Sequence, residues 1–365
     1  MNAAPQISAI LPVKNGAAYI GAAIESLFAQ TFADFELLVI DDGSSDETVA
    51  IVEGLGKSDR RLHLLRNPGM GLVDALNFGI AAARAPLIAR MDADDIALPE
   101  RLQRQYEYLA AHPDIDAVGT QVHFIDANGA RTGKSSALPQ DPAAVAKTLL
   151  KFCCLRHPTV TMRKAAAERA GGYRAEFVAA EDLDLWLRLA EHGELANLPE
   201  ALLLYRLHAG QVTNEKMWTQ RLSRNLAIIA AEERRAGRRD PVAHYACFRR
   251  EAGKHECRGL GCAKPVCESL RALRAAEALL EGAGHRLSDD DARLLLRYVS
   301  RHGIGDGKTN RVRVLVALCR EAARWRAPKL LALAFGLAFR IHPGRAIKMM
   351  DFLNLRSNSI RIRKG

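Results

Sequence analysis

The start of this 365-residue chain lacks the features of a targeting segment. Residues 1–6 carry no basic group, and no apolar stretch of the signal-peptide kind follows them. The cysteines number seven, an odd count, and they are scattered along the chain. Because cysteines without disulfide partners are typical of the cytosol, we expect reduced thiols and a cytoplasmic protein.

A complete zinc-binding pattern is also missing. Cys257, Cys262 and Cys267 are evenly spaced, with Cys247 and two histidines nearby. The set as a whole fits no standard zinc-binding pattern, so we expect ordinary thiols here rather than a metal site.

Aromatic residues make up only 6% of the chain, and acidic residues are scarce in its second part. Residues 1–214 hold 20 Lys and Arg against 27 Asp and Glu, a net charge of −7, whereas residues 215–365 hold 32 against 15, a net charge of +17. This contrast predicts two units, residues 1–214 and residues 215–365. A basic unit can bind nucleic acid, but with few aromatic side chains to stack on bases we expect no such partner.

The apolar run at residues 330–339 is too short to span a bilayer, which takes about 20 residues. Basic residues flank it on both sides, and residues 361–365 are basic as well. Two interpretations stay open: a helix packed on the protein with a solvated basic face, or a helical platform on the anionic cytoplasmic leaflet of the inner membrane.

Strands and helices alternate in the first unit. Apolar runs rich in β-branched residues predict strands at residues 7–13, 35–40, 61–65, 86–91, 117–125, 153–162 and 201–207. Helical spacing predicts helices at residues 19–30, 72–83, 99–111, 142–150 and 181–189, and one that ends near residue 55 after the N-cap candidates Ser44, Ser45 and Asp46. This order predicts an α/β fold with a mostly parallel sheet flanked by helices. Residues 221–233 begin a mainly helical C-terminal region.

Polar residues follow three of the predicted strands. They are Pro12 to Asn15, Asp41 to Asp42, and an acidic cluster of Asp92, Asp94 and Asp95. Ligands of such sheets bind beyond the carboxyl ends of the strands, so we expect these residues at one rim. Three carboxylates this close repel one another unless a cation lies among them, and a divalent cation with a diphosphate is the usual one. The alternative for the cluster alone is an exposed acidic turn before the next helix.

The motifs resemble, in order and spacing, family-2 glycosyltransferases, which have the Rossmann-like GT-A fold. The resemblance covers residues 7–214, and residues 215–365 resemble nothing that we can name. It rests on Pro12 to Asn15, Val39 to Asp46, Asn67 to Gly71, Met91 to Asp95, His157 to Val160, Gly171 to Tyr173, Glu181 to Arg188 and Tyr205 to His208.

This resemblance implies transfer of a sugar from a nucleotide diphosphate, most simply a UDP-sugar, with inversion at the anomeric carbon. Asp42 would accept the N3–H of the base, with Pro12 and Asn15 near the base, and Asp92 would contact the nucleotide sugar. Asp94, with Asp95, would hold Mn²⁺ or Mg²⁺ on the diphosphate. His208 occupies the place of a further metal ligand, and the alternative for it is an ordinary exposed histidine after a strand.

The chemistry of transfer also requires a base on the acceptor side, because the acceptor hydroxyl has a high pKa. Asp182 is our candidate, and Glu181 would orient it or line the donor pocket. The alternative for both acids is a favourable interaction with the N-terminus of the helix that follows. We expect a glycan or glycolipid acceptor in cell-surface glycan synthesis, such as lipopolysaccharide, O-antigen or capsule.

Other functions stay open at this point. A nucleotidyltransferase that makes sugar nucleotides would use similar acids, but it normally has a Gly-rich basic loop after the first strand, where this chain has Lys14 to Ala17. A nucleic-acid-binding protein would use the basic tail, and a non-catalytic relative would lack some of the acids.

Overall fold

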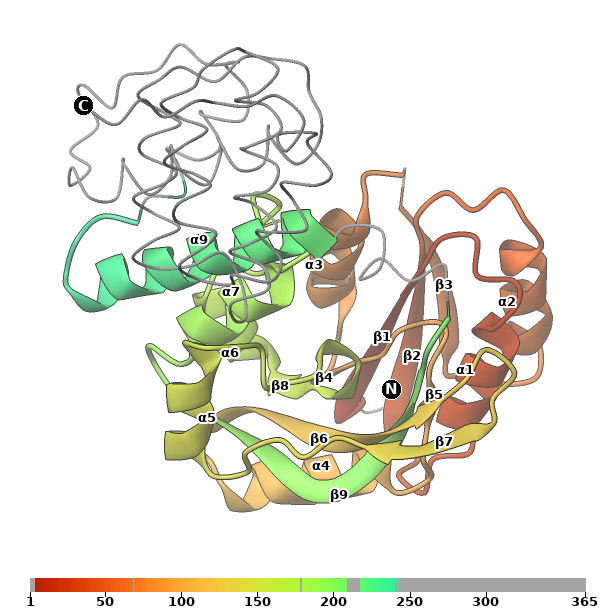
Figure 1. Ribbon diagram of the computed structural model, residues 1–365. Coiled ribbons are helices and arrows are strands. Elements are labelled where there is room, and N and C mark those ends of the chain that lie inside the picture. Colours follow the sequence, from red (N-terminus) through yellow and green to blue (C-terminus); the bar gives the residue numbers. More distant parts are fainter. Residues whose placement is uncertain (1–3, 68, 178, 209–216, 241, 243–365) are drawn as a thin grey trace, which may run out of the picture. The chain divides into compact units, whose positions relative to one another are not determined.

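The computed structural model describes residues 4–67, 69–177, 179–208, 217–240 and 242 (Figure 1). The backbone divides into two units, Met1–Glu215 and Lys216–Gly365, and each is treated by itself. The strands of the first unit are β1 Ile7–Val13, β2 Phe35–Asp41, β3 Leu62–Arg66, β4 Leu87–Arg90, β5 Ile96–Ala97, β6 Ile115–Ile125, β7 Arg131–Ser135, β8 Thr161–Arg163 and β9 Glu194–Arg206. Its helices are α1 Ile20–Phe28, α2 Thr48–Gly56, α3 Leu72–Ala82, α4 Arg101–Ala111, α5 Pro142–Leu149, α6 Lys164–Arg169 and α7 Glu181–Leu189, with a 3₁₀ turn, η1, at His157–Thr159.

These strands form one curled sheet in the order β3-β2-β1-β4-β8-β6-β9-β5, with β7 paired to β6. The first four strands along the chain are parallel to one another, and every residue of β1 and β2 is buried. Strands covered on both faces read as continuous apolar runs, which explains the composition of β1 and β2. The prediction of a mostly parallel sheet flanked by helices is therefore confirmed.

The two faces of β1 and β2 are covered by different helices. Residues at odd positions of β1, such as Leu11, belong to a core with apolar side chains of α1, α2 and α4. Helix α3 packs on the other face, where a side chain added to Gly79 would lie 2.7 Å from Ile10. Side chains alternate along a strand, so the two faces of the sheet are covered by different helices. The loops that follow the strands then border their carboxyl ends, where ligands of such sheets bind.

The second half of the sheet departs from the parallel pattern. Strand β8 pairs antiparallel with β4 and with β6, and the short strand β5 pairs antiparallel with β9. Strand β9 begins at Glu194, seven residues before the predicted start, and runs parallel to β6 as far as Arg206. The first residues of β9 therefore lie beside the start of β6, and its last residues lie beside β5.

The prediction of a strand over residues 153–162 was wrong. Only Thr161–Arg163 pairs as a strand, and the residues before it form the turn η1. Pro158 has no N–H to give to a ladder, and the N–H groups of Thr159 and Val160 bond back to Arg156 and His157 instead. This turn carries the chain from α5 into the sheet.

In the second unit the structure describes α9 Met217–Arg235, which contains the predicted helix at residues 221–233. The apolar run at residues 330–339, the three evenly spaced cysteines and the basic C-terminus lie outside the described residues. Among the helices that the structure describes, none has the length and apolarity to cross a bilayer.

Candidate active site

The loops after β1 and β2 are tied together by side chain to backbone hydrogen bonds. Asn15 donates its N–H to Ser44 Oγ at 2.9 Å, and its side-chain oxygen accepts the N–H of Ser45 at 2.8 Å. Asn15 adopts a left-handed backbone conformation, with φ of 51°, which asparagine tolerates better than most residues. The predicted N-caps of α2 were wrong, because the residue at the N-cap is Glu47, whose side chain makes no cap bond. Asp46 accepts the N–H of Thr48 from one position earlier, and Ser44 and Ser45 bond to Asn15.

Asp42 lies buried directly after β2, and its N–H donates to the carbonyl oxygen of Val13, between Pro12 and the loop that carries Asn15. Its carboxylate accepts Asn67 Nδ2 at 2.7 Å and the N–H of Gly71 at 3.1 Å, and Lys14 Nζ lies 4.0 Å away. Two carboxylate oxygens offer about four acceptor positions, so this carboxylate can accept a further donor. Asn67 and Gly71 were not among the predicted site residues, because their role depends on a loop that returns to Asp42.

The acidic cluster lies after β4 on the same rim. One oxygen from each of Asp92, Asp94 and Asp95 lies within 4.8 Å of the others, a spacing that suits one shared metal ion. Oxygen ligands of this kind suit Mg²⁺ and Mn²⁺. His208 Nε2 lies 2.9 Å from Oδ2 of Asp94, so the structure brings the histidine predicted as a further ligand to the cluster.

Asp95 is the most buried member of the cluster. Its Oδ1 accepts the N–H of Arg206 at 2.9 Å, and its Oδ2 is buried without a hydrogen-bond partner among the described residues. Burial raises the pKa of this carboxyl well above its usual range, and the charges of Asp92 and Asp94 raise it further. A buried oxygen that lacks a partner costs free energy, which a cation bound there would remove. The donor set therefore fits a divalent metal.

Arg90 is a buried cation that the sequence did not identify. Its Nη2 pairs with Oδ1 of Asp92 at 2.5 Å, while its Nε and Nη1 find no partner among the described residues. The Arg90 guanidinium also counteracts the rise that burial causes in the pKa of Glu181 and of Asp182. Arg90 therefore forms an ion pair with the acidic cluster after β4 and interacts electrostatically with the two acids at the start of α7.

The pair Glu181 and Asp182 opens α7. Burial, and then the charge of Asp182, raise the pKa of Glu181 to about 7. Burial also raises the pKa of Asp182, against the N–H of Leu183, which donates to Oδ1 at 2.7 Å. The Cys153 thiol donates to Oδ2 of Asp182 across 3.4 Å, so a residue before η1 reaches the predicted base.

Buried guanidiniums accompany the acids of this site. Arg90 pairs with Asp92, the Arg206 side chain donates to the carbonyl oxygen of Asp94, and the charges of Asp95 and Asp92 act on buried Arg101. A divalent cation held by the acidic cluster would add to this positive charge.

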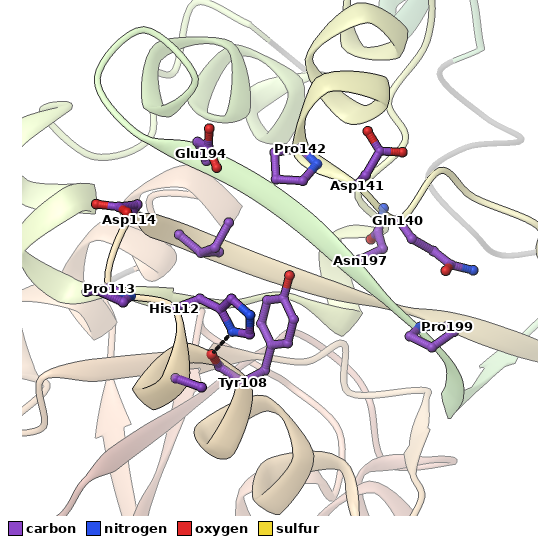
Figure 2. A pocket seen from close by; sticks show the side chains of 12 residues that line it. Tyr108, His112, Pro113, Asp114, Gln140, Asp141, Pro142, Glu194, Asn197 and Pro199 are labelled. Atoms are coloured by element: carbon purple, nitrogen blue, oxygen red, sulfur yellow. Dashed lines mark hydrogen bonds between the residues drawn. The ribbon is translucent and has the colours of Figure 1, made fainter.

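A groove of about 590 Å³ lies elsewhere, between the end of α4, the start of α5 and the start of β9 (Figure 2). Tyr108, His112, Asp141 and Glu194 line it, and it contains no predicted site residue. Strands β6 and β9 start near this groove and run parallel, so their carboxyl ends, which carry Arg206, point away from it. The groove is therefore separate from the acidic rim.

Comparisons of the sequence with known proteins find glycosyltransferases. The family model for "Glycosyl transferase family 2" matches residues 8–169. An uncharacterized glycosyltransferase of Haemophilus influenzae is 31% identical over 223 residues, which are 59% of this chain and 69% of that protein. The O-antigen biosynthesis glycosyltransferase WbnJ of Escherichia coli is 34% identical over 206 residues, 55% of this chain and 80% of WbnJ. The amylovoran biosynthesis glycosyltransferase AmsE of Erwinia amylovora is 32% identical over 201 residues, 53% of this chain and 73% of AmsE.

Among solved structures, S. aureus TarS 1-349 in complex with UDP-GlcNAc is similar, with a TM-score of 0.57 at 16% identity. The match covers 93% of this chain and 92% of that one. At this identity the likeness establishes a shared fold, and it agrees with the predicted GT-A architecture.

Proposed function

The chain belongs to glycosyltransferase family 2, and on this premise we propose that it is an inverting, metal-dependent enzyme that moves a sugar from a UDP-sugar to a hydroxyl acceptor. The observation that carries the proposal is the acidic cluster after β4, in which one oxygen from each of three carboxylates lies within 4.8 Å of the others, next to buried Arg90 and to His208. The acidic cluster after β4 pairs with Arg90, and the charges of Glu181 and Asp182 act on Arg90 as well. One group is suited to the donor diphosphate and the other to the acceptor hydroxyl.

On the donor side, Asp42 accepts the N3–H of the base, with Pro12 and Asn15 beside it. Asn67 and Gly71 hold the Asp42 carboxylate in place for this bond. Uracil and thymine present the same N3–H, so the contact fits both UDP and dTDP. TarS was crystallised with UDP-GlcNAc and shares the fold, which motivates UDP as the first donor to test.

Asp94, Asp95 and His208 are the residues that would hold a divalent cation, and Asp92 contacts the nucleotide sugar. When bound, Mn²⁺ or Mg²⁺ neutralises the negative charge that develops on the leaving diphosphate. The buried Oδ2 of Asp95, which has no hydrogen-bond partner within the described part of the chain, supports this assignment.

On the acceptor side, Asp182 takes the proton of the attacking hydroxyl while the bond from the anomeric carbon to the diphosphate breaks. A direct displacement of this kind inverts the anomeric centre and needs one base. Glu181, with a pKa of about 7, lies next to Asp182 and orients it or lines the donor pocket. Asp92, Asp94 and Asp95 are engaged with Arg90, His208 and Arg206, which leaves Glu181 and Asp182, and of these two we assign the base to Asp182.

Two relatives act in O-antigen and amylovoran biosynthesis by their names, so we propose a glycan or glycolipid acceptor in cell-surface glycan synthesis. Such acceptors are carried on membranes, which agrees with a cytoplasmic enzyme held at the inner membrane by its basic second unit. Family membership favours sugar transfer over nucleotidyl transfer and over nucleic-acid binding as the main activity.

The test uses the purified full chain with a panel of UDP-, dTDP- and GDP-sugars and measures released nucleoside diphosphate with Mn²⁺, Mg²⁺ or EDTA. We expect release from one donor class, lost in EDTA and in Asp94→Ala. Asp114→Asn, which changes an acid in the separate groove, is the matched control and should behave as the wild type. Full activity of Asp94→Ala in chelator would exclude the proposed metal site.

A further inference from the structure

Arg206, the last residue of β9, contacts the acidic loop after β4, the turn after β6 and Tyr19. Its backbone N–H donates to Oδ1 of Asp95 at 2.9 Å, and its Nε donates to the carbonyl oxygen of Asp94 at 2.7 Å. Its Nη1 donates to the carbonyl oxygens of Asp126 and Ala127 in the turn after β6, at 3.3 and 3.1 Å. One residue, 4% exposed, therefore holds the acidic loop to the ends of two strands.

The same guanidinium continues into an aromatic stack. The Arg206 guanidinium carbon lies 4.6 Å from the ring centroid of Tyr19, and the Tyr19 ring centroid lies 5.3 Å from that of His208. Arg206 and His208 are two residues apart and lie against the same tyrosine ring. A guanidinium over an aromatic face is attracted by the ring quadrupole, which fixes Tyr19 and with it the neighbouring imidazole.

The orientation of the 94–95 peptide decides what its side chains can do. Asp94 Oδ2 lies 2.9 Å from His208 Nε2, and Asp95 Oδ1 accepts the N–H of Arg206, although the carboxylates repel one another. Strand β5 begins only at Ile96, so ladder hydrogen bonds do not fix this peptide, and the N–H of Asp95 makes a long bond of 3.4 Å to the carbonyl oxygen of Asp92. The bonds from Arg206, at 2.7 and 2.9 Å, add the tighter constraint.

We propose that Arg206 is a positioning residue for the metal site: it fixes the Asp94–Asp95 peptide directly and the His208 ring through Tyr19. This inference rests on the proposed function, because it assumes that Asp94, Asp95 and His208 bind the cation. The four hydrogen bonds above all go to oxygens of the protein, and a guanidinium, which carries donors alone, would offer no ligand to a cation. Its role is to preset the distances between ligands before the cation arrives.

A purely structural role of Arg206 is the competing interpretation. Both roles predict some loss of stability when Arg206 is changed, so stability alone does not separate them. Metal affinity does, because residues that orient ligands typically change metal affinity by about 10 to 100-fold when they are replaced. Arg163 offers a matched control, since it donates to the carbonyl oxygens of Leu109, His112 and Ile115, away from the cluster.

The experiment measures Mn²⁺ binding by the full chain, from the EPR signal of the unbound ion, with UDP present. The variants are Arg206→Lys, which keeps the charge without the planar guanidinium, Arg206→Met, Tyr19→Leu and Arg163→Met. Circular dichroism and the Tm of each variant report whether it is folded. Tyr19→Leu keeps the proposal testable if Arg206→Met does not fold, because it removes only the stack.

We expect the Kd for Mn²⁺ to rise by at least about tenfold in Arg206→Lys and Arg206→Met, to rise less in Tyr19→Leu, and to stay unchanged in Arg163→Met. Wild-type Mn²⁺ affinity in folded Arg206→Lys and Tyr19→Leu would overturn the inference. If the wild-type chain itself bound no Mn²⁺ while still releasing nucleoside diphosphate, the metal assignment would fail and the inference with it. The two failures are therefore distinguishable.

Discussion

His208 Nε2 lies 2.9 Å from Oδ2 of Asp94, although 114 residues separate them in the chain. The contact exists because β9 runs parallel to β6 and pairs, through Leu204, with Ile96 just after the acidic cluster. His208, which follows β9, is thereby brought to Asp94 in the loop after β4. This geometry favours a ligand role for His208 over that of an ordinary surface histidine.

Replacing His208 tests that role directly. We expect His208→Ala to raise the Mn²⁺ concentration needed for half-maximal release of nucleoside diphosphate by about tenfold or more, because one ligand to the cation is lost. His112→Ala, which removes an imidazole from the separate groove, should leave that concentration unchanged. Identical metal titrations for His208→Ala and the wild type would return His208 to the surface interpretation.

Asp182→Asn should fold and bind the donor as the wild type does, yet transfer at least about 100-fold more slowly, the scale of a lost general base. The amide keeps the size of the side chain and can still accept the N–H of Leu183. The measurement compares kcat for transfer with the Kd for UDP. Near-normal kcat in Asp182→Asn together with an inactive Glu181→Gln would assign the base to Glu181.

The raised pKa of Glu181 predicts that the stability of the folded protein depends on pH. Its pKa is about 7 in the folded protein against 4.5 for the ordinary carboxyl group, because burial disfavours the charged form. A group with a raised folded-state pKa stabilises the protein fully below pH 4.5 and loses that contribution as the pH rises to about 7. For Glu181 the loss is on the order of 3 kcal/mol, and Asp182, whose pKa is also raised, acts in the same direction.

The wild type should lose stability between pH 4.5 and pH 7, whereas Glu181→Gln should not lose this contribution, since glutamine does not ionise. We therefore expect the free energy of unfolding of Glu181→Gln, minus that of the wild type, to increase over this pH range. Urea unfolding followed by tryptophan fluorescence measures this, because the buried Trp186 lies in the same helix, α7. Glu53→Gln, an exposed acid paired with Arg66, is the control and should run parallel to the wild type. Parallel curves for Glu181→Gln would show that this carboxyl is not protonated on folding.

The basic second unit predicts binding to an anionic membrane surface. We expect the full chain to sediment with vesicles that contain phosphatidylserine or phosphatidylglycerol and to be released by high salt, since each basic group near such a surface contributes about 1 kcal/mol. Replacing Arg361, Arg363 and Lys364 by serine should weaken the binding. Equal binding to neutral and anionic vesicles at low salt would favour a helix packed on the protein.

Much of the fold was predictable from local patterns. Continuous apolar runs predicted β1 and β2, because both faces of these strands are buried. The helical spacing of apolar residues predicted α1, because only one face of this helix is buried. The second half of the sheet was harder. Residues 153–162 had the apolar composition of a strand, but Pro158 and the turn around it decided otherwise.

For the site, the acids were predictable by type and position because a strand end places its next residues at a known rim. From the sequence we predicted Asp42 and the cluster after β4 at one rim, and Glu181 and Asp182 at the start of a helix. Local patterns did not reveal which residues meet in the folded chain: Asn67 on Asp42, Cys153 on Asp182, Arg90 on Asp92, and Arg206 on the 94–95 peptide. An arginine inside an apolar strand, or at the end of one, carries no local signal that names its partner. Its partner is chosen by strand pairing, which depends on residues up to 112 positions away.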